Sequence, residues 1–183
     1  MRTLVSINVA RPGTITWRGK EVDTGIFKEP IAGPVAVGRL GLAGDRQADL
    51  RVHGGPRKAV YLYPAEHYGF WRREFPEREL PPGTFGENLT TSGVLESEVR
   101  EGDQLRIGSV VLEVTDPRFP CFKLAAKFGL PDMIRRFAAA RRPGLYLAVV
   151  ETGTIEAGQP LQLTRGHAAG PTIADVFRRK FDE

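Results

Sequence analysis

Short apolar runs separated by glycine and proline dominate the hydrophobic pattern of the chain. Residues 3–9 alternate between apolar and polar side chains apart from Leu4, which predicts a strand. Residues 104–107 and 110–115 flank Gly108-Ser109, and a glycine in the first position of a two-residue loop predicts a hairpin with a type II′ turn. The other predicted strands are residues 25–31, 34–37, 59–63, 145–150 and 161–164. Strands this short and numerous favour a mainly β fold, a closed barrel of mostly antiparallel strands without exposed edges.

Three segments follow the period of an α-helix and are expected at the periphery of the barrel. The first is predicted to begin at Pro64, because proline suits the first turn of a helix. The second begins at residues 131–132, and the third at Thr172, which can form a capping box with Asp175. The apolar stripes of the three helices are Tyr68, Trp71 and Phe75, then Ile134, Phe137 and Ala138, then Ile173, Val176, Phe177 and Phe181.

The third helix divides the chain into a predicted β-barrel domain, residues 1–168, and a C-terminal helix, residues 169–183. Its apolar stripe needs a partner, because four large apolar side chains in water would be costly in free energy. The stripe can pack on the barrel of its own chain or on a second copy of the protein. Since a terminal element on a short tether easily reaches a neighbour, we favour a homodimer.

Composition is that of an ordinary globular protein. Hydrophobic residues make up 41% and charged residues 26% of the 183 residues. No apolar run approaches the ~20 residues that cross a bilayer. The N-terminus lacks the apolar region and cleavage site of a signal peptide, so we expect a cytoplasmic protein without a membrane partner. A formal net charge of +4 favours anionic ligands, such as nucleic acid, a membrane surface or a phosphorylated small molecule.

Cys121 is the only cysteine of the chain and lies in an unusual segment. A lone cysteine forms no internal disulfide and is most often a small buried hydrophobe. Here, however, Pro117 and Pro120 stiffen the approach to it, and the residues after it favour a helix whose first turn would stabilise a thiolate. Arg118 and Lys123 add positive charge. These conditions predict a reactive or metal-binding thiol.

A glycine-rich polar segment, residues 38–58, shows no evident secondary structure. Long segments of this kind in a compact domain are usually functional, and glycine lets the backbone approach a ligand. Arg46, His53 and Lys58 could meet a phosphate or an electron-rich ring. A polar surface loop explains the same pattern equally well.

A second polar segment, residues 83–91, resembles a turn that runs into a strand. Its side chains offer many donors and acceptors, and Asn88 can donate and accept at once, as the edge of a pterin requires. Ordinary turn chemistry is the alternative explanation for asparagine and threonine in such a segment.

Five sequence elements together closely resemble the MOSC domain family. They are Gly41-Leu42-Ala43-Gly44-Asp45-Arg46, Val52-His53-Gly54-Gly55 with Lys58-Ala59-Val60, Gly86-Glu87-Asn88-Leu89-Thr90, Gly102-Asp103 with Ile107-Gly108, and Pro117-Arg118-x-Pro120-Cys121. Their order and spacing are similar to those of the stand-alone bacterial branch, which reduces N-hydroxylated purines such as 6-hydroxylaminopurine. The resemblance covers residues 3–165, and the third and fifth elements together make it specific.

The resemblance implies a β-barrel like that of pyruvate kinase, with a few peripheral helices, and a bound molybdenum cofactor of the molybdopterin type. It implies an oxidoreductase that reduces N-hydroxylated bases or related compounds, with Cys121 as the protein ligand to molybdenum. The expected catalytic residues are Cys121, His53 and Asp45. The expected cofactor-binding residues are Arg118, Asn88, Thr90, Gly86, Glu87, Arg46, Gly54 and Lys58. Longer members carry a three-helix extension, and only residues 172–183 resemble its beginning here, so contacts that depend on that extension are not expected.

A reductase of this kind needs electrons from elsewhere. The sequence shows no flavin or haem motif, and one cysteine cannot hold an iron–sulfur cluster alone. The expected partners are therefore a separate electron-donating reductase and a small N-hydroxylated substrate. Two other functions compete: a sulfur carrier with a persulfide on Cys121, and a non-catalytic barrel that binds anions or nucleic acid. Nucleic acid is the weaker candidate, because aromatic and basic residues do not interleave as a stacking platform requires.

Overall fold

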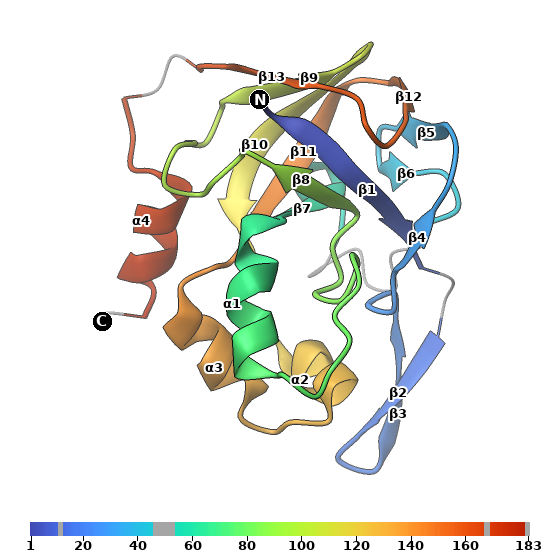
Figure 1. The fold of residues 1–183 in the computed structure, drawn as a ribbon, viewed down its shortest axis with the longest axis vertical. Coiled ribbons are helices and arrows are strands. Elements are labelled where there is room, and N and C mark those ends of the chain that lie inside the picture. The colour runs from blue at the N-terminus through green and yellow to red at the C-terminus, as the bar shows by residue number, and fades with distance from the viewer. Residues whose placement is uncertain (11–12, 46–53, 167–168, 182–183) are drawn as a thin grey trace.

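A curved eight-stranded sheet forms the centre of the computed structural model, which describes residues 1–10, 13–45, 54–166 and 169–181 (Figure 1). Its strands follow the order β13-β9-β10-β11-β7-β8-β1-β4, and β7 and β8 are parallel whereas the other described pairs are antiparallel. These strands are β1 (Thr3–Val9), β4 (Glu29–Ile31), β7 (Val60–Pro64), β8 (Leu89–Ser92), β9 (Gln104–Ile107), β10 (Val110–Pro117), β11 (Leu145–Glu151) and β13 (Leu161–Thr164).

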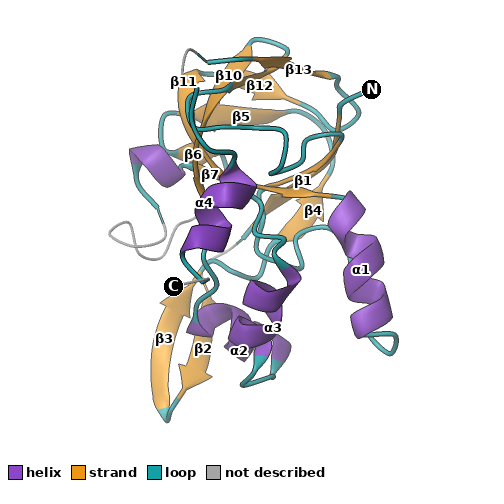
Figure 2. Cartoon of the chain, turned by 90° about the vertical axis from the view of Figure 1, so that its left-hand side faces the viewer, coloured by secondary structure: helices purple, strands orange, loops and turns teal. Residues whose placement is uncertain are grey.

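Two smaller sheets and four α-helices complete the fold. A three-stranded sheet joins β12 (Gly153–Ile155), β5 (Val35–Gly38) and β6 (Gly41–Leu42), and a separate hairpin joins β2 (Gly13–Trp17) and β3 (Lys20–Thr24). The helices are α1 (Glu66–Glu74), α2 (Phe122–Phe128), α3 (Met133–Ala140) and α4 (Ile173–Arg179), with a short 3-10 helix η1 (Pro56–Lys58). Figures 1 and 2 both show α1, α2 and α3 gathered at one end of the large sheet.

The large sheet curls so that the start of β1 meets the segment that leads into β13. Leu4 N donates to Gln159 O over 2.9 Å, and Leu161 N donates to Arg2 O over 2.9 Å. An isolated bridge between Thr3 and Pro160 lies between these bonds, and no longer ladder joins β1 to β13 in the described residues. The structure therefore confirms the mainly β, mostly antiparallel part of the prediction, whereas the closed barrel is not confirmed.

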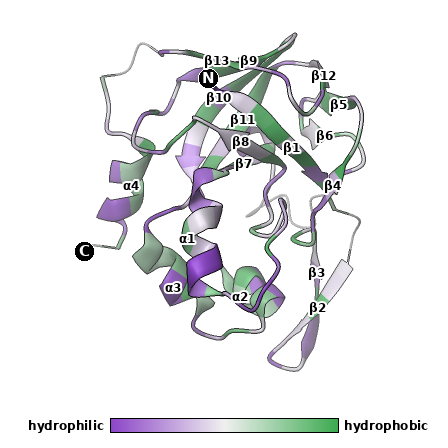
Figure 3. Cartoon of the chain, in the orientation of Figure 1, coloured by the Kyte–Doolittle hydropathy of each residue, from purple (hydrophilic) through white to green (hydrophobic). Residues whose placement is uncertain are grey.

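The molecule contains two hydrophobic cores. Aliphatic side chains from the strands fill the inside of the curved sheet, and Figure 3 shows hydrophobic residues running along several of these strands. An aromatic core lies between the sheet and the three gathered helices, with Tyr63, Trp71, Phe85 and Phe137 all nearly or fully buried. This second core supports the polypeptide segments that carry the pocket described below.

The predicted elements match the structure best where the signal is local. β1 has the predicted bounds, and in the β9–β10 hairpin Gly108 has a φ of 56° while Ser109 has no positive φ, as a type II′ turn requires. The β2–β3 hairpin was not predicted from the sequence. Its turn places Arg18 at φ 50°, a left-handed conformation that is uncommon for residues other than glycine, so an arginine there gives no turn signal in the sequence. Pro64 ends β7 rather than beginning α1, which starts at Glu66.

The C-terminal helix α4 packs on its own chain. Its predicted capping box between Thr172 and Asp175 is present. Ile173 and Phe177 are each 1% exposed, and the Phe177 ring lies 5.5 Å from that of Phe119. Two of the four stripe residues therefore find partners within the chain, which removes our reason for favouring a homodimer; the oligomeric state itself stays a prediction. Among the described residues, none of the helices has the length and apolar character needed to cross a membrane.

Candidate functional site

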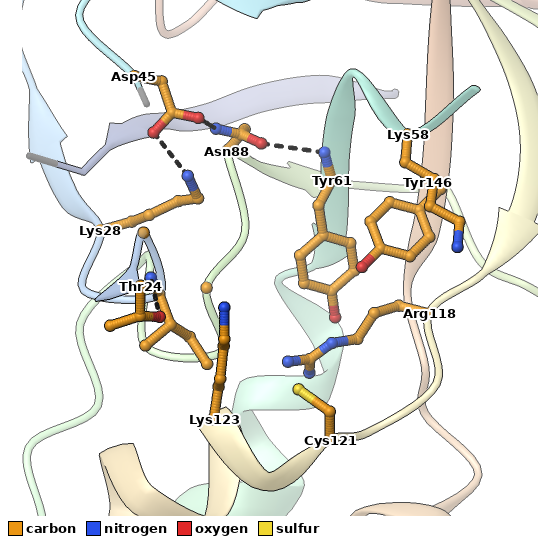
Figure 4. Close-up of a pocket in the computed structure, with 13 residues that line it drawn as sticks. Thr24, Lys28, Asp45, Lys58, Tyr61, Asn88, Arg118, Cys121, Lys123 and Tyr146 are labelled. Atoms are coloured by element: carbon orange, nitrogen blue, oxygen red, sulfur yellow. Dashed lines mark hydrogen bonds and ion pairs between the residues drawn. The ribbon is translucent and has the colours of Figure 1, made fainter. Parts of the chain in front are cut away.

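A pocket lies where the large sheet, the β2–β3 hairpin and the start of α2 meet (Figure 4). Segments distant in sequence contribute to it: the turn after β3, the end of the β6 loop, η1, β7, the loop before β8, the β10–α2 connection and β11. The lining residues are Thr24, Gly25, Ile26, Lys28, Asp45, Lys58, Tyr61, Gly86, Asn88, Arg118, Cys121, Lys123 and Tyr146. The pocket thus unites all three segments to which the sequence assigned chemistry.

Cys121 lies at the N-cap of α2, one position before the first turn predicted from the sequence. Its extended backbone (φ −133°) turns the chain from the proline-rich connection into the helix, and its residue is partly exposed to the pocket. In the described parts of the chain no cluster of three or more His, Cys, Asp or Glu side chains could hold a metal ion. Cys121 lines the pocket together with the cationic Arg118 and Lys123, and the reactive or metal-binding role of its thiol stays a prediction.

Arg118 presents a buried cation to the pocket beside Cys121 (Figure 4). The residue is 5% exposed, and its Cζ lies 5.2 Å from the ring centres of both Tyr61 and Phe137. Its Nη1 atom is buried, and no residue that the structure describes accepts a hydrogen bond from it. Arginine keeps its charge, and a buried donor without an acceptor costs free energy. This nitrogen is therefore suited to donate a hydrogen bond to an anionic or other acceptor group of a ligand.

Asp45, Lys28 and Asn88 form a hydrogen-bonded group on another side of the same pocket (Figure 4). Asp45 Oδ1 accepts hydrogen bonds from Lys28 Nζ (2.6 Å) and from the Ala10 main-chain N (2.8 Å). Asp45 Oδ2 accepts from Asn88 Nδ2 (2.8 Å), and Asn88 Oδ1 accepts from the Tyr61 main-chain N (3.1 Å). Asn88 therefore uses its amide to hold Asp45 against β7, instead of reading a ligand edge with both ends.

Positive charge dominates the lining of the pocket. Among the residues that the structure describes, Lys28, Lys58, Arg118 and Lys123 line it, and Asp45 contributes the one carboxylate. Lys58 Nζ lies 5.5 Å from the centre of the Tyr146 ring, and Lys123 Nζ donates to the main-chain oxygen of Asp23 (3.0 Å). Such an excess of cations in a partly enclosed site attracts anionic ligands.

Glu87 and Thr90 are buried beside the pocket and are not among its lining residues. Glu87 is fully buried and accepts hydrogen bonds from the Gly83 N (2.8 Å), the Phe85 N (3.1 Å), the Thr90 hydroxyl (2.9 Å) and the Tyr68 hydroxyl. Burial raises the pKa of the Glu87 carboxyl, and these hydrogen bonds act against that rise. Both residues thus hold the loop before β8 in place without lining the pocket, and their contact with a cofactor stays a prediction.

The glycines expected at the site differ in position. Gly86 lines the pocket with a φ of 84°, and a Cβ there would lie 2.9 Å from Ile26 Cγ1, so the position requires glycine. Gly54 is half-buried and is not a lining residue. Arg46 and His53 lie outside the described residues.

Sequence reasoning missed several lining residues, among them Lys28, Tyr61 and Tyr146. Tyr61 and Tyr146 were placed only in predicted strands, and antiparallel pairing of β7 with β11 sets them opposite each other. The hydroxyl that distinguishes tyrosine from phenylalanine in a buried strand was the available signal. Lys28 carried no signal, because only the fold brings it to Asp45.

Lys127, near the end of α2, ties together two segments that border the pocket. Its Nζ donates to the main-chain oxygens of Ile26 (3.0 Å) and Gly83 (2.9 Å). Burial lowers the pKa of this lysine from 10.5 to about 8, since the charged form loses its hydration.

Replacement of Lys127 by methionine is expected to change how stability depends on pH. Between about pH 8 and 10.5 the unfolded wild-type chain holds a proton that the folded chain has released, so wild-type stability rises with pH there. Relative to Lys127→Met, the wild type should gain up to roughly 3 kcal/mol over this interval. Urea unfolding of both proteins at a series of pH values measures the difference. Parallel pH profiles of the two proteins would show that Lys127 titrates normally.

Comparison with known proteins identifies the family. A sequence model described as MOSC domain matches residues 49–162. The chain is 44% identical over 181 residues to "Uncharacterized protein YflK" of Bacillus subtilis, covering 99% of this chain and 81% of that protein. It is 38% identical over 148 residues to a protein called "Reductase" from Gibberella moniliformis, covering 79% of this chain and 26% of that protein.

A solved structure supports the same relationship. The crystal structure of YiiM from Geobacillus stearothermophilus superimposes with a TM-score of 0.81 at 35% sequence identity, covering 98% of this chain and 84% of that one. The sequence match includes Cys121, Arg118, Lys58 and Asn88 within residues 49–162. The chain therefore belongs to the MOSC domain family and is a homologue of the YiiM-type MOSC proteins.

Proposed function

We propose that this protein binds a molybdenum cofactor in the Cys121 pocket and reduces N-hydroxylated bases or related N-hydroxylated compounds. One observation carries the proposal: the single thiol of the chain lines a pocket with an excess of positive charge together with Arg118, whose buried Nη1 has no acceptor among the residues that the structure describes. MOSC domains are associated with molybdenum-cofactor binding in general, and one relative of this chain is called a reductase.

The donor set of the pocket fits a cofactor that carries a metal and a phosphate. A cysteine thiolate is a soft ligand suited to a metal that already has sulfur ligands, so Cys121 would bind molybdenum. Arg118 would donate Nη1–H to a cofactor oxygen, because that hydrogen has no acceptor among the described residues. Lys58 and Lys123 add positive charge for a phosphate.

In this proposal the cofactor supplies the redox chemistry, and the protein positions the cofactor and the substrate. When bound, the molybdenum cofactor supplies the two-electron redox chemistry that amino-acid side chains lack. Asn88 and Asp45 keep β7 and the loop before β8 at a fixed separation, and Gly86 lets that loop approach closely. Tyr61 and Tyr146 line the pocket as neutral, largely buried rings, since burial raises the pKa of both.

The reaction implies partners and a compartment. We propose a separate electron-donating reductase as the protein partner, and a small N-hydroxylated compound as the substrate. A reducing compartment such as the cytoplasm suits Cys121, because a cysteine must stay reduced to bind the metal as a thiolate.

Expression in two hosts, one that makes molybdenum cofactor and one that cannot, tests the proposal. Protein from the first host should contain molybdenum by elemental analysis and reduce 6-hydroxylaminopurine with a chemical electron donor, and protein from the second should do neither. A purified protein without molybdenum from the competent host would contradict the proposal. A persulfide on Cys121 of that protein, seen by mass spectrometry, would instead favour a sulfur carrier.

A further inference from the structure

Reduction of an N-hydroxylated compound consumes protons as well as electrons. The overall change is R–NHOH + 2 e⁻ + 2 H⁺ → R–NH₂ + H₂O: the N–O bond breaks, the nitrogen takes one proton, and the hydroxyl takes the other and leaves as water. The electrons come from the separate donor of the proposed function, on which this inference rests. The protons must reach the substrate inside the pocket.

Lys28 is placed to supply such a proton. It lines the pocket, with its side chain 8% exposed, and its Nζ lies 2.6 Å from Oδ1 of Asp45, whose side chain is 3% exposed. Three donors reach the Asp45 carboxylate: Lys28 Nζ, the Ala10 N and Asn88 Nδ2. An ammonium group has three N–H bonds, and the bond to Asp45 uses one.

Three other polar side chains of the pocket are less suitable. Arg118 does not release its proton near neutral pH. Tyr61 donates its hydroxyl to the Pro143 main-chain oxygen (2.8 Å), and burial raises its pKa well above the ordinary value. Lys123 donates to the main-chain oxygen of Asp23 (3.0 Å) and sits two positions from Cys121, on the side where we place the metal. Lys28 instead lies with Asp45, away from Cys121 in the view of Figure 4.

We infer that Lys28 is a catalytic residue that donates a proton to the leaving hydroxyl of the substrate during N–O cleavage, and that Asp45 is its positioning residue. The nitrogen takes the second proton from water. The bond to Asp45 fixes Nζ at one side of the pocket, and Cys121 lies at another, so a substrate bound between them would meet both. After donation, the neutral amine stays hydrogen-bonded to Asp45 and regains a proton from water at the pocket mouth.

Electrostatics support this role. Burial lowers the pKa of Lys28, and the Asp45 carboxylate acts in the opposite direction. Glu87 also favours the charged form, whereas Lys127 is a like charge on the α2 side. An amine whose pKa lies below that of a free lysine gives up its proton more readily near neutral pH, as a general acid should.

Substitution of Lys28 by arginine separates proton donation from charge. Lys28→Arg keeps a cation beside Asp45, but a guanidinium does not act as an acid at the working pH. In molybdenum-loaded protein we expect kcat to fall by about 10²–10⁴-fold, while molybdenum content and KM stay within about threefold of wild type. Lys20→Arg, the same change at an exposed lysine of β3, should match the wild type in all three quantities.

A readout independent of turnover accompanies the kinetics. NMR of the lysine side-chain carbons should show a signal that titrates below the pH of the exposed lysines, that disappears in Lys28→Arg and that is distinct from the signal of Lys127, which remains in this variant. If that signal titrates with the surface lysines, the inference is wrong.

The kinetic outcomes separate the two proposals. Active wild type with a Lys28→Arg variant of equal kcat overturns the role of Lys28 and leaves the proposed function standing. Loss of molybdenum from Lys28→Arg with unchanged kcat per molybdenum assigns the residue to cofactor binding, which also overturns the inference. Wild-type protein that holds molybdenum and reduces no N-hydroxylated compound contradicts the proposed function and the proton donor with it.

Discussion

Replacing Cys121 by serine is expected to give a folded protein that retains little molybdenum and does not measurably reduce 6-hydroxylaminopurine. The hydroxyl of serine is a harder and far less acidic ligand than a thiol, so it replaces the thiolate poorly at a soft metal centre. The fold should persist, because Cys121 is partly exposed at the N-cap of α2 and serine is a favourable N-cap residue. Molybdenum per chain, turnover and the urea midpoint together measure the effect.

The variant Cys121→Ala serves as the control for this prediction. It also lacks the thiol, so it should lose molybdenum and turnover equally, but it cannot cap α2 and should be less stable than Cys121→Ser by about 1 kcal/mol. Should either variant keep the molybdenum content and turnover of the wild type, the metal ligand lies elsewhere in the protein.

The residues predicted best for the site are those whose neighbours in the sequence already create their environment. Cys121 and Arg118 belong to one short proline-rich connection, which fixes their direction before any long-range contact forms. Lys28 is held in the pocket by its hydrogen bond to Asp45, seventeen positions further along the chain. Tyr61 lies opposite Tyr146 only because β7 pairs with β11. The local sequence pattern does not predict such long-range contacts.

Polar residues in the segment before β8 illustrate a second limit. Asn88, Glu87 and Thr90 offer the donors and acceptors that a ligand would need, and the sequence therefore indicated cofactor contacts. In the structure most of these groups satisfy one another and nearby main-chain atoms. Hydrogen-bonding capacity identifies a special segment, but only the fold shows whether its partners are internal or belong to a ligand.

The sequence also predicted the individual strands better than the closure of the sheet into a barrel. Alternation and turn residues predicted individual strands such as β1 and β13, because those signals are local. Closure depends on how the first strand meets the segment before the last one, and there a few main-chain hydrogen bonds near Leu4 and Gln159 replace a continuous ladder. Pro160, which has no N–H to donate, lies within this junction and limits the pairing.

Replacing Glu87 by leucine is expected to cause the largest loss of stability of the substitutions considered. Leucine has a similar volume but accepts no hydrogen bond, so the Gly83 and Phe85 main-chain N–H groups would remain buried and unsatisfied. Each such group costs about 1–3 kcal/mol, and the two together should lower the free energy of unfolding by about 2–6 kcal/mol. Urea unfolding of the cofactor-free protein measures this loss without any contribution from a ligand.

The exposed Glu77 provides the matched control, since Glu77→Leu makes the same chemical change in a surface loop and should alter stability by no more than about 0.5 kcal/mol. Glu87→Gln should be intermediate, because it keeps one acceptor oxygen but turns an amide donor toward one of the buried N–H groups. The comparison also decides between the two roles of the segment before β8. If Glu87→Leu unfolds like the wild type yet loses molybdenum, then Glu87 contacts the cofactor as the family resemblance implied, and the internal hydrogen bonds around its carboxylate do not hold the loop.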